Sequence, residues 1–260
     1  MSFNMRLYYK LSQIVLLFGY GLLLAGLVFP ALALALSAQR AKRQRDALKL
    51  HWLRLFSSIL RLTVTLTGEP PKAGALLVSN HISWMDIVVI GRFLPAYFVA
   101  KSDILGWPVI GYLARQGGTI FIRRGDKRQI KATAEQMLWA LKQQSTVIVF
   151  PEGTTTNGQD VLGFHTSLLQ PALLTHAPVQ PVALQYQGPA ALHAPFIGDD
   201  AFLPHLLNIL RMDHIDVSVN FLPLIKVAGK DRISLGSEAR AAILAAIVDG
   251  PEALAVPSLA

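Results

Sequence analysis

The fold of this chain is decided by the run Ala75-Leu76-Leu77-Val78-Ser79-Asn80-His81-Ile82-Ser83-Trp84-Met85-Asp86. Its first five residues predict a short buried strand, and an imidazole and a carboxylate follow it at a spacing of five. On one continuous helix such residues lie about 140° apart, so they meet only if His81 is on a turn and Asp86 in the next helix. A histidine oriented by a carboxylate can act as a general base.

The same spacing also has an explanation without catalysis. Ser83 can cap the helix, and Asp86, three residues later, can supply the acidic half of a capping box. The pair alone therefore does not establish an enzyme. Further motifs are needed to decide.

Three further blocks follow in order, and Lys101 lies between the His81–Asp86 block and the first of them. They are Gly118-Thr119-Ile120-Phe121-Ile122-Arg123-Arg124, Phe150-Pro151-Glu152-Gly153-Thr154 and Val179-Gln180-Pro181-Val182. With His81-x4-Asp86, the chain resembles the 1-acylglycerol-3-phosphate acyltransferase family of membrane glycerolipid acyltransferases. The resemblance spans residues 75 to 186. It implies His81 and Asp86 as catalytic residues, and as substrate-binding residues Arg123, Arg124, Glu152, Gly153 and Thr154.

The resemblance also implies the reaction. A fatty acyl chain would move from acyl-CoA or acyl-carrier protein, as co-substrate, to the free hydroxyl of a lysolipid, with 1-acylglycerol-3-phosphate as the expected acceptor and phosphatidic acid as product. The family usually has an arginine where this chain has Thr155, which puts the acceptor head group in question. A lyso-ornithine lipid O-acyltransferase is the alternative. A membrane-associated lipid hydrolase is a third hypothesis, but no Gly-x-Ser-x-Gly motif occurs.

Composition narrows the remaining classes. The sequence has no cysteine, no Walker loop and no dinucleotide fingerprint, and its other histidines lack ligand spacing, so we expect neither cofactor nor metal. Of the net charge of +8, residues 1–63 carry nine basic side chains against one acidic, while the rest balances. This distribution favours anionic lipid as a partner over nucleic acid.

The amino-terminal region predicts attachment to a membrane. Ile14 to Leu36 is 23 residues without a charge, enough to span a bilayer as a helix or to form a re-entrant hairpin. The basic cluster that follows places the catalytic part on the cytoplasmic side of the inner membrane. Leu48 to Ile59 predicts an amphipathic helix, expected in the interface, with packing on the catalytic domain as the alternative. Residues 1–67 would anchor the catalytic domain, 68–260.

Beyond Gly68, short apolar runs alternate with helical periodicity, which predicts an α/β fold with a mixed sheet covered by helices. The predicted strands are Ala75–Ser79, Tyr97–Lys101, Thr119–Ile122, Thr146–Phe150, Pro181–Gln185 and Val217–Leu222, and the predicted helices are Trp84–Phe93, Lys127–Gln143, Phe202–Arg211 and Ser237–Val248. The motifs then fall at strand ends, where open sheets bind ligands.

Overall fold

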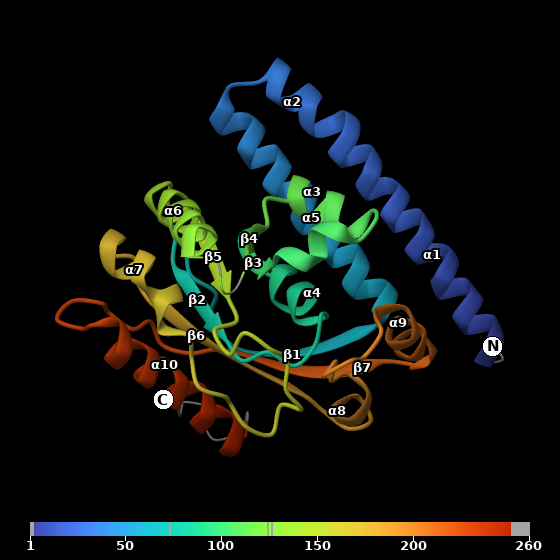
Figure 1. Ribbon diagram of the computed structural model, residues 1–260. Coiled ribbons are helices and arrows are strands. Elements are labelled where there is room, and N and C mark those ends of the chain that lie inside the picture. Colours follow the sequence, from blue (N-terminus) through green and yellow to red (C-terminus); the bar gives the residue numbers. More distant parts are fainter. Residues whose placement is uncertain (1–2, 73, 124, 126, 251–260) are drawn as a thin grey trace, which may run out of the picture.

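The computed structural model describes residues 3–72, 74–123, 125 and 127–250. In these parts of the chain, a seven-stranded sheet is covered by helices on both faces, as predicted (Figure 1). The strands are β1 (Leu62–Gly68), β2 (Leu76–Ser79), β3 (Ala96–Lys101), β4 (Ile120–Ile122), β5 (Thr146–Val149), β6 (Val179–Tyr186) and β7 (Ile215–Phe221). The α-helices are α1 (Phe3–Leu23), α2 (Phe29–Ala35), α3 (Ala38–Leu60), α4 (Asp86–Gly91), α5 (Ile110–Gln116), α6 (Lys127–Lys142), α7 (Gln170–Thr175), α8 (Ala190–His193), α9 (Phe202–Arg211) and α10 (Arg232–Val248), with a π-helix η1 (Leu24–Val28) and the 3₁₀ turns η2 (Ser102–Gly106) and η3 (Thr166–Leu169).

The strand order is β1-β7-β6-β2-β5-β3-β4, and the only antiparallel pair in this order is β6 with β7. Strands β6, β2, β5, β3 and β4 are therefore parallel, and their carboxyl ends share one edge of the sheet. The loops that follow β2, β3, β4 and β5 all leave from that edge. This arrangement brings distant motifs of the sequence together.

The sheet separates two apolar cores because successive side chains on a strand point to opposite faces. Leu77 and Ile148 belong to the core beneath α1, α3, α4 and α9. Their neighbours Leu76 and Val147 belong to the core beneath α6, α7 and α10. Strands buried on both faces explain the continuous apolar runs of the sequence.

All six predicted strands and all four predicted helices are present, but β1 was missed. Its sequence Leu62-Thr63-Val64-Thr65-Leu66-Thr67-Gly68 alternates apolar and polar residues, as an edge strand with one covered face does. It pairs in parallel with β7 over its full length. The predicted division between residues 67 and 68 therefore falls inside a strand of the sheet.

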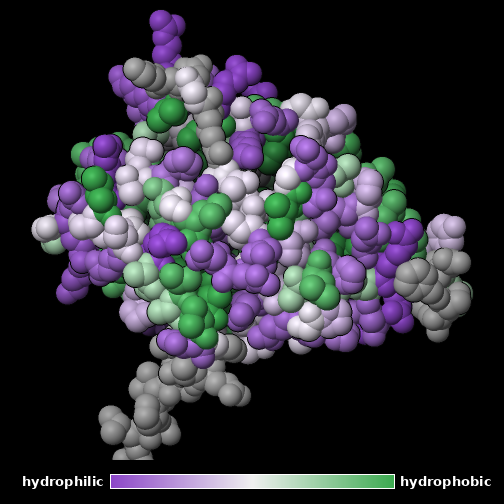
Figure 2. All heavy atoms as spheres, turned by 60° about the horizontal axis from the view of Figure 1, so that its bottom comes forward, coloured by the Kyte–Doolittle hydropathy of each residue, from purple (hydrophilic) through white to green (hydrophobic). Residues whose placement is uncertain are grey.

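The apolar amino-terminal segment forms α1, η1 and α2. Residues Met5 to Ala35 are a helix long and apolar enough to cross a membrane. The π-helical turn precedes Pro30, whose ring cannot donate a backbone hydrogen bond, and the Phe29 N–H reaches back to Leu24 O. On the outer side, large apolar residues are exposed, among them Leu16 (72%) and Leu34 (90%). The face turned forward in Figure 2 has polar and apolar side chains interspersed.

The prediction that the amphipathic helix lies in the membrane interface is wrong for most of its apolar face. In α3, Phe56 and Leu60 are buried, and Trp52 packs against the same core. Helix α3 contacts both α1 and α4. The indole N–H of Trp52 donates to Leu17 O at 2.9 Å, so α1 and α3 are also joined by a polar contact. The competing interpretation, packing on the catalytic domain, is confirmed.

Candidate active site

The turn after β2 is fixed by Asn80. Its amide Nδ2 donates to Leu184 O at 2.9 Å, and its Oδ1 accepts the Leu184 N–H at 2.8 Å. Both partners belong to the neighbouring strand β6. A fully buried asparagine that forms two backbone hydrogen bonds stops the chain from continuing as a strand, and the next residue, His81, turns out of the sheet.

His81 and Asp86 meet across this turn, as the spacing required. His81 Nδ1 lies 2.7 Å from Asp86 Oδ2. The imidazole ring stacks on Phe150, with 4.1 Å between ring centroids. Its side chain is 20% exposed, while that of Asp86 is fully buried. Nε2 has no hydrogen-bond partner among the residues that the structure describes, and His81 lines a large cavity.

Asp86 begins α4 and is the centre of the turn. Besides His81, its Oδ2 accepts the backbone N–H groups of Ile82 at 2.7 Å and Ser83 at 3.0 Å. Its Oδ1 accepts the Tyr186 hydroxyl at 2.9 Å. The capping box is only half formed: the Ser83 N–H donates to Asp86 Oδ2, but the buried Ser83 hydroxyl has no partner in the described part of the chain, and Met85 occupies the N-cap position.

Tyr186 was missed by the sequence analysis, since no motif marks the last residue of β6. Burial raises the pKa of this tyrosine well above its ordinary value, and the Asp86 carboxylate raises it further. The hydroxyl therefore remains a donor to Asp86. Together with the two backbone donors, it satisfies the oxygens of a fully buried carboxyl group by hydrogen bonding.

Glu152 was expected to contact the substrate, but its carboxylate binds backbone groups of the protein instead. Its Oε1 accepts the His81 N–H and its Oε2 accepts the Leu162 N–H, both at 2.8 Å. The side chain is only 4% exposed. Burial raises the pKa of Glu152, although both backbone donors oppose that shift. The carboxylate thus joins the turn at His81 to the loop at Leu162, and it is not among the residues that line the cavity.

The loop after Glu152 closes over the histidine turn. Gly153 has φ +70°, which favours glycine, and its N–H donates to Phe150 O at 3.0 Å. That N–H is therefore already paired within the loop and is not available to a bound substrate. Thr154 and Thr155 line the cavity. The Thr155 hydroxyl, at the position where the family usually has an arginine, hydrogen-bonds to Phe196 O.

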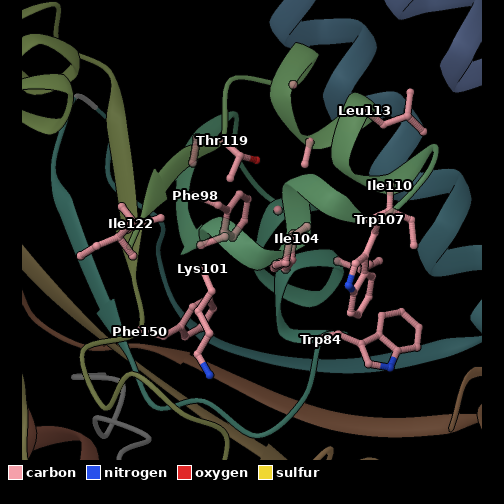
Figure 3. A pocket seen from close by; sticks show the side chains of 18 of the residues that line it. Trp84, Phe98, Lys101, Ile104, Trp107, Ile110, Leu113, Thr119, Ile122 and Phe150 are labelled. Atoms are coloured by element: carbon pink, nitrogen blue, oxygen red, sulfur yellow. The ribbon is translucent and has the colours of Figure 1, made fainter. Parts of the chain in front are cut away.

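The two predicted arginines follow β4. Arg123 is exposed and is not among the residues that line the cavity. Arg124 lies outside the described residues. Lys101, at the end of β3, lines the cavity, and Figure 3 shows its side chain extending there. The motif order had drawn attention to Lys101 without assigning it a role.

The cavity has a volume of about 740 Å³ and lies between the sheet edge and the amino-terminal helices. Its walls are mainly apolar and come from distant segments, including Phe29 of α2 and Phe56 of α3. Figure 3 shows Phe98 of β3 and Leu113 of α5 on the same walls. One polar end carries His81. An apolar chamber with a few polar groups at one end is typical of a site that takes a lipid chain.

In the described part of the chain, no group of three or more His, Asp or Glu side chains could hold a metal ion. The geometry of the His81–Asp86 pair is suited to proton transfer. The free Nε2 of His81 faces a chamber in which a hydroxyl and an acyl group can meet.

Comparison with known proteins identifies the family of this chain. The chain matches the family model described as Acyltransferase over residues 61–185. It is 39% identical over 239 residues to the lyso-ornithine lipid O-acyltransferase of Pseudomonas aeruginosa, covering 86% of this chain and 90% of that protein. It is 31% identical over 179 residues to the 1-acyl-sn-glycerol-3-phosphate acyltransferase of Neisseria gonorrhoeae, covering 68% and 70%.

The crystal structure of the 1-acyl-sn-glycerophosphate acyltransferase PlsC from Thermotoga maritima superposes with a TM-score of 0.70. The match covers 94% of this chain and 97% of that one at 20% identity, and so it shows a shared fold. The fold and the enzyme class predicted from the motifs are confirmed. This chain belongs to the acyltransferase family, together with the lysolipid acyltransferases that it matches.

Proposed function

We propose that this protein transfers a fatty acyl chain to the free hydroxyl of a lyso-ornithine lipid at the membrane surface, with His81 as general base. The observation that carries this proposal is the His81–Asp86 pair at the polar end of an apolar cavity. The acyl donor is a thioester of coenzyme A or of acyl-carrier protein.

The reaction is a direct transfer between two bound substrates. His81 Nε2 takes the hydroxyl proton as the oxygen attacks the thioester carbonyl carbon. The carbon–sulfur bond then breaks, and the imidazolium returns its proton to the leaving thiolate. Asp86 stabilises the imidazolium and fixes its tautomer, because its Oδ2 accepts from Nδ1. Tyr186 and Glu152 are positioning residues, since they act on Asp86 and on the His81 backbone.

The acceptor choice rests on head-group charge and on similarity. Thr155 replaces a cation at the mouth of the site, and its hydroxyl is occupied by Phe196 O. Lys101 is the remaining ammonium near this end of the cavity in the described residues. One cation suits the single carboxylate of an amino-acid lipid better than a phosphate dianion. The identity to the Pseudomonas relative is also higher and spans more of the chain.

A second candidate acceptor is 1-acylglycerol-3-phosphate. The Neisseria relative named for that substrate is 31% identical. With this acceptor, Arg123 and Arg124 would replace the missing arginine as phosphate contacts. Thr154, on the cavity wall, would contact the head group of either acceptor.

Membrane attachment is supported by the exposed apolar side of α1 and by the charge of residues 1–63. The basic residues Arg40 and Arg43 are exposed directly after the apolar segment. Under the positive-inside rule, this basic segment supports an orientation with the catalytic part on the cytoplasmic face of the inner membrane.

The test is acyl transfer by the purified full chain with both lysolipids and both donor types. We expect product with lyso-ornithine lipid and much less with lysophosphatidate, and Thr155→Arg should shift this ratio toward the phosphate lipid. Acylation of lysophosphatidate alone would select the second candidate. Release of free fatty acid without acceptor would indicate the hydrolase and overturn the transferase mechanism.

A further inference from the structure

A second cavity lies between α3 and the amino-terminal ends of β3 and β4, whereas the catalytic pair lies at the carboxyl ends of the parallel strands. Its volume is about 310 Å³. Ala33, Ala38 and Ala41 line one wall, and Gly117 with Gly118 lines another. These small residues leave room for a group that is not part of the protein.

Three cations of α3 line this cavity, namely Lys42, Arg45 and Lys49. All three are half-buried and share a helix face with the buried Ala41, whereas Arg40 and Arg43 are exposed. The basic cluster of the sequence therefore has two parts. Only one part faces solvent, and the other faces the protein, where a cation requires a negative partner.

The cavity supplies too few negative partners. Asp46 is the one carboxylate on its wall, and it binds both Lys42 at 2.7 Å and Lys49 at 2.8 Å. Lys49 also donates to Gly117 O at 3.2 Å, and Arg45 donates to Gln116 O at 3.3 Å while its guanidinium lies over the Phe29 ring. Lys49 also lies over the Tyr97 ring, so three positive charges share one carboxylate, two carbonyl groups and two aromatic faces, of which only the carboxylate carries a full negative charge.

Capping of α5 accounts for part of this arrangement. Gln116 ends α5 and Gly117 follows it, and a helix carboxyl end carries about half a negative charge. That half charge and Asp46 together leave more than one positive charge unbalanced. Capping of this helix end would need only one cation, yet both Arg45 and Lys49 donate to its carbonyl groups. Lys42 donates to Asp46 and to neither carbonyl group, so capping does not explain it.

The pKa shifts of Lys49 and Asp46 agree with a shortage of negative charge in this cavity. Burial lowers the pKa of Lys49 from its ordinary value, and the attraction of Asp46 does not restore it. Burial also opposes ionisation of Asp46, but Lys49 and Lys42 outweigh it and hold the pKa of Asp46 below its ordinary value. A further anion in the cavity would favour the charged form of Lys49.

We propose that Lys42, Arg45 and Lys49 form a phosphate-binding site that takes the head-group phosphate of an anionic membrane lipid. The cavity begins where the apolar helix α2 ends, so with the apolar segment embedded in a bilayer it would lie near the boundary between hydrocarbon and head groups. Lys49 and Gly117 line both cavities, so a lipid bound here would lie beside the reaction chamber without entering it. The proposal rests on the membrane location given above, and not on the choice of acceptor.

Thermal unfolding of the full chain in detergent tests this site. The probes are dihexanoyl phosphatidylglycerol, inorganic phosphate and coenzyme A, each titrated over a range of concentrations. We expect the lipid to raise Tm in a saturable way, since a ligand that binds only the folded state stabilises it. The double variant Lys42→Gln/Arg45→Gln should weaken apparent binding at least about tenfold, because charge-assisted hydrogen bonds are lost.

The matched control is Arg40→Gln/Arg43→Gln, which removes the same charge from the exposed side of the same helix. It should keep the wild-type response. Equal weakening in both double variants, or no saturable response of the wild type to any probe, would refute the site. A response to coenzyme A stronger than to the lipid would retain the phosphate site but assign it to the acyl donor. Because unfolding is measured and not turnover, failure of acyl transfer would count against the proposed function alone.

A second pair of variants keeps the test decisive if the double variant does not fold. Ala38→Glu places a carboxylate on the cavity wall, and Gln39→Glu places one on the neighbouring exposed position of the same helix turn. We expect Ala38→Glu to raise Tm without ligand and to abolish the lipid response. Equal behaviour of the two variants would refute the anion deficit.

Discussion

Asp86→Asn isolates the charge of the catalytic pair from its geometry. Asp86 Oδ2 faces three donors, from Ile82, Ser83 and His81, and its Oδ1 faces the Tyr186 hydroxyl. In asparagine, the carbonyl oxygen must take the Oδ2 place, since two backbone N–H groups would oppose an NH₂ group there. The NH₂ group then faces Tyr186, whose hydroxyl can rotate to accept. The hydrogen bonds persist and only the charge is lost.

The size of the effect follows from the separation of the two groups. A unit charge pair about 4 Å apart interacts by about 4 kcal/mol at an effective dielectric constant of 20. This interaction exists only once His81 is protonated, so it stabilises the transition state and not the resting enzyme. We expect kcat to fall by about 10³-fold with little change in Tm.

The assay is steady-state acyl transfer with thermal unfolding measured on the same preparation. More than one tenth of wild-type turnover in the folded Asp86→Asn enzyme would refute the charge argument. Tyr186→Phe is the matched control, because it leaves the charge and removes one donor to Oδ1. Its loss should be nearer tenfold, from about 1.5 kcal/mol. A greater loss for Tyr186→Phe than for Asp86→Asn would show that position matters more than charge.

Other variants test the remaining parts of the site. His81→Ala should lower turnover by about 10² to 10⁴-fold in a folded, membrane-bound protein, and turnover above a tenth of wild type would exclude it as the base. Glu152→Gln should lower the free energy of unfolding by about 1–3 kcal/mol, measured by thermal unfolding, because one buried backbone N–H loses its acceptor. Burial lowers the pKa of His205, so just below pH about 6.5 the unfolded chain gains a proton that the folded chain does not, and the free energy of unfolding should decrease as the pH decreases. His205→Leu should lack that part of the pH dependence of Tm. The full chain should resist both high salt and alkaline carbonate and need detergent for extraction, whereas release by salt alone would show that charge and not the apolar helix attaches it.

The sheet and the catalytic pair could be predicted because their signals are local. Short apolar runs mark buried parallel strands, and a histidine and an aspartate at a spacing of five specify a turn. By contrast, β1 was missed although Leu62 to Thr67 alternates apolar residues with threonines, which is the local signal of a strand with one covered face. What the sequence did not show is its partner, because β7 lies about 150 residues later in the chain.

The contacts that differ from prediction depend on tertiary structure. Glu152 has the composition of a substrate contact, yet the return of the chain at Leu162 occupies it. Tyr186 reaches Asp86 only because β6 lies beside β2. The burial of Lys42, Arg45 and Lys49 could not be inferred either. The helical repeat predicts which residues share a face of α3, but not which part of the protein packs against that face.

The pairing of β1 with β7 has a consequence for biosynthesis. The first helices leave the ribosome long before β7 exists, and the Lys10 ammonium finds its acceptor at Met212 O, just before β7. The described residues that line the reaction chamber all precede β7 in the chain, so the chamber walls and the catalytic pair are synthesised before the last strand. The pairing of β1 with β7 then completes the sheet and joins the amino-terminal part of the fold to the carboxyl-terminal part.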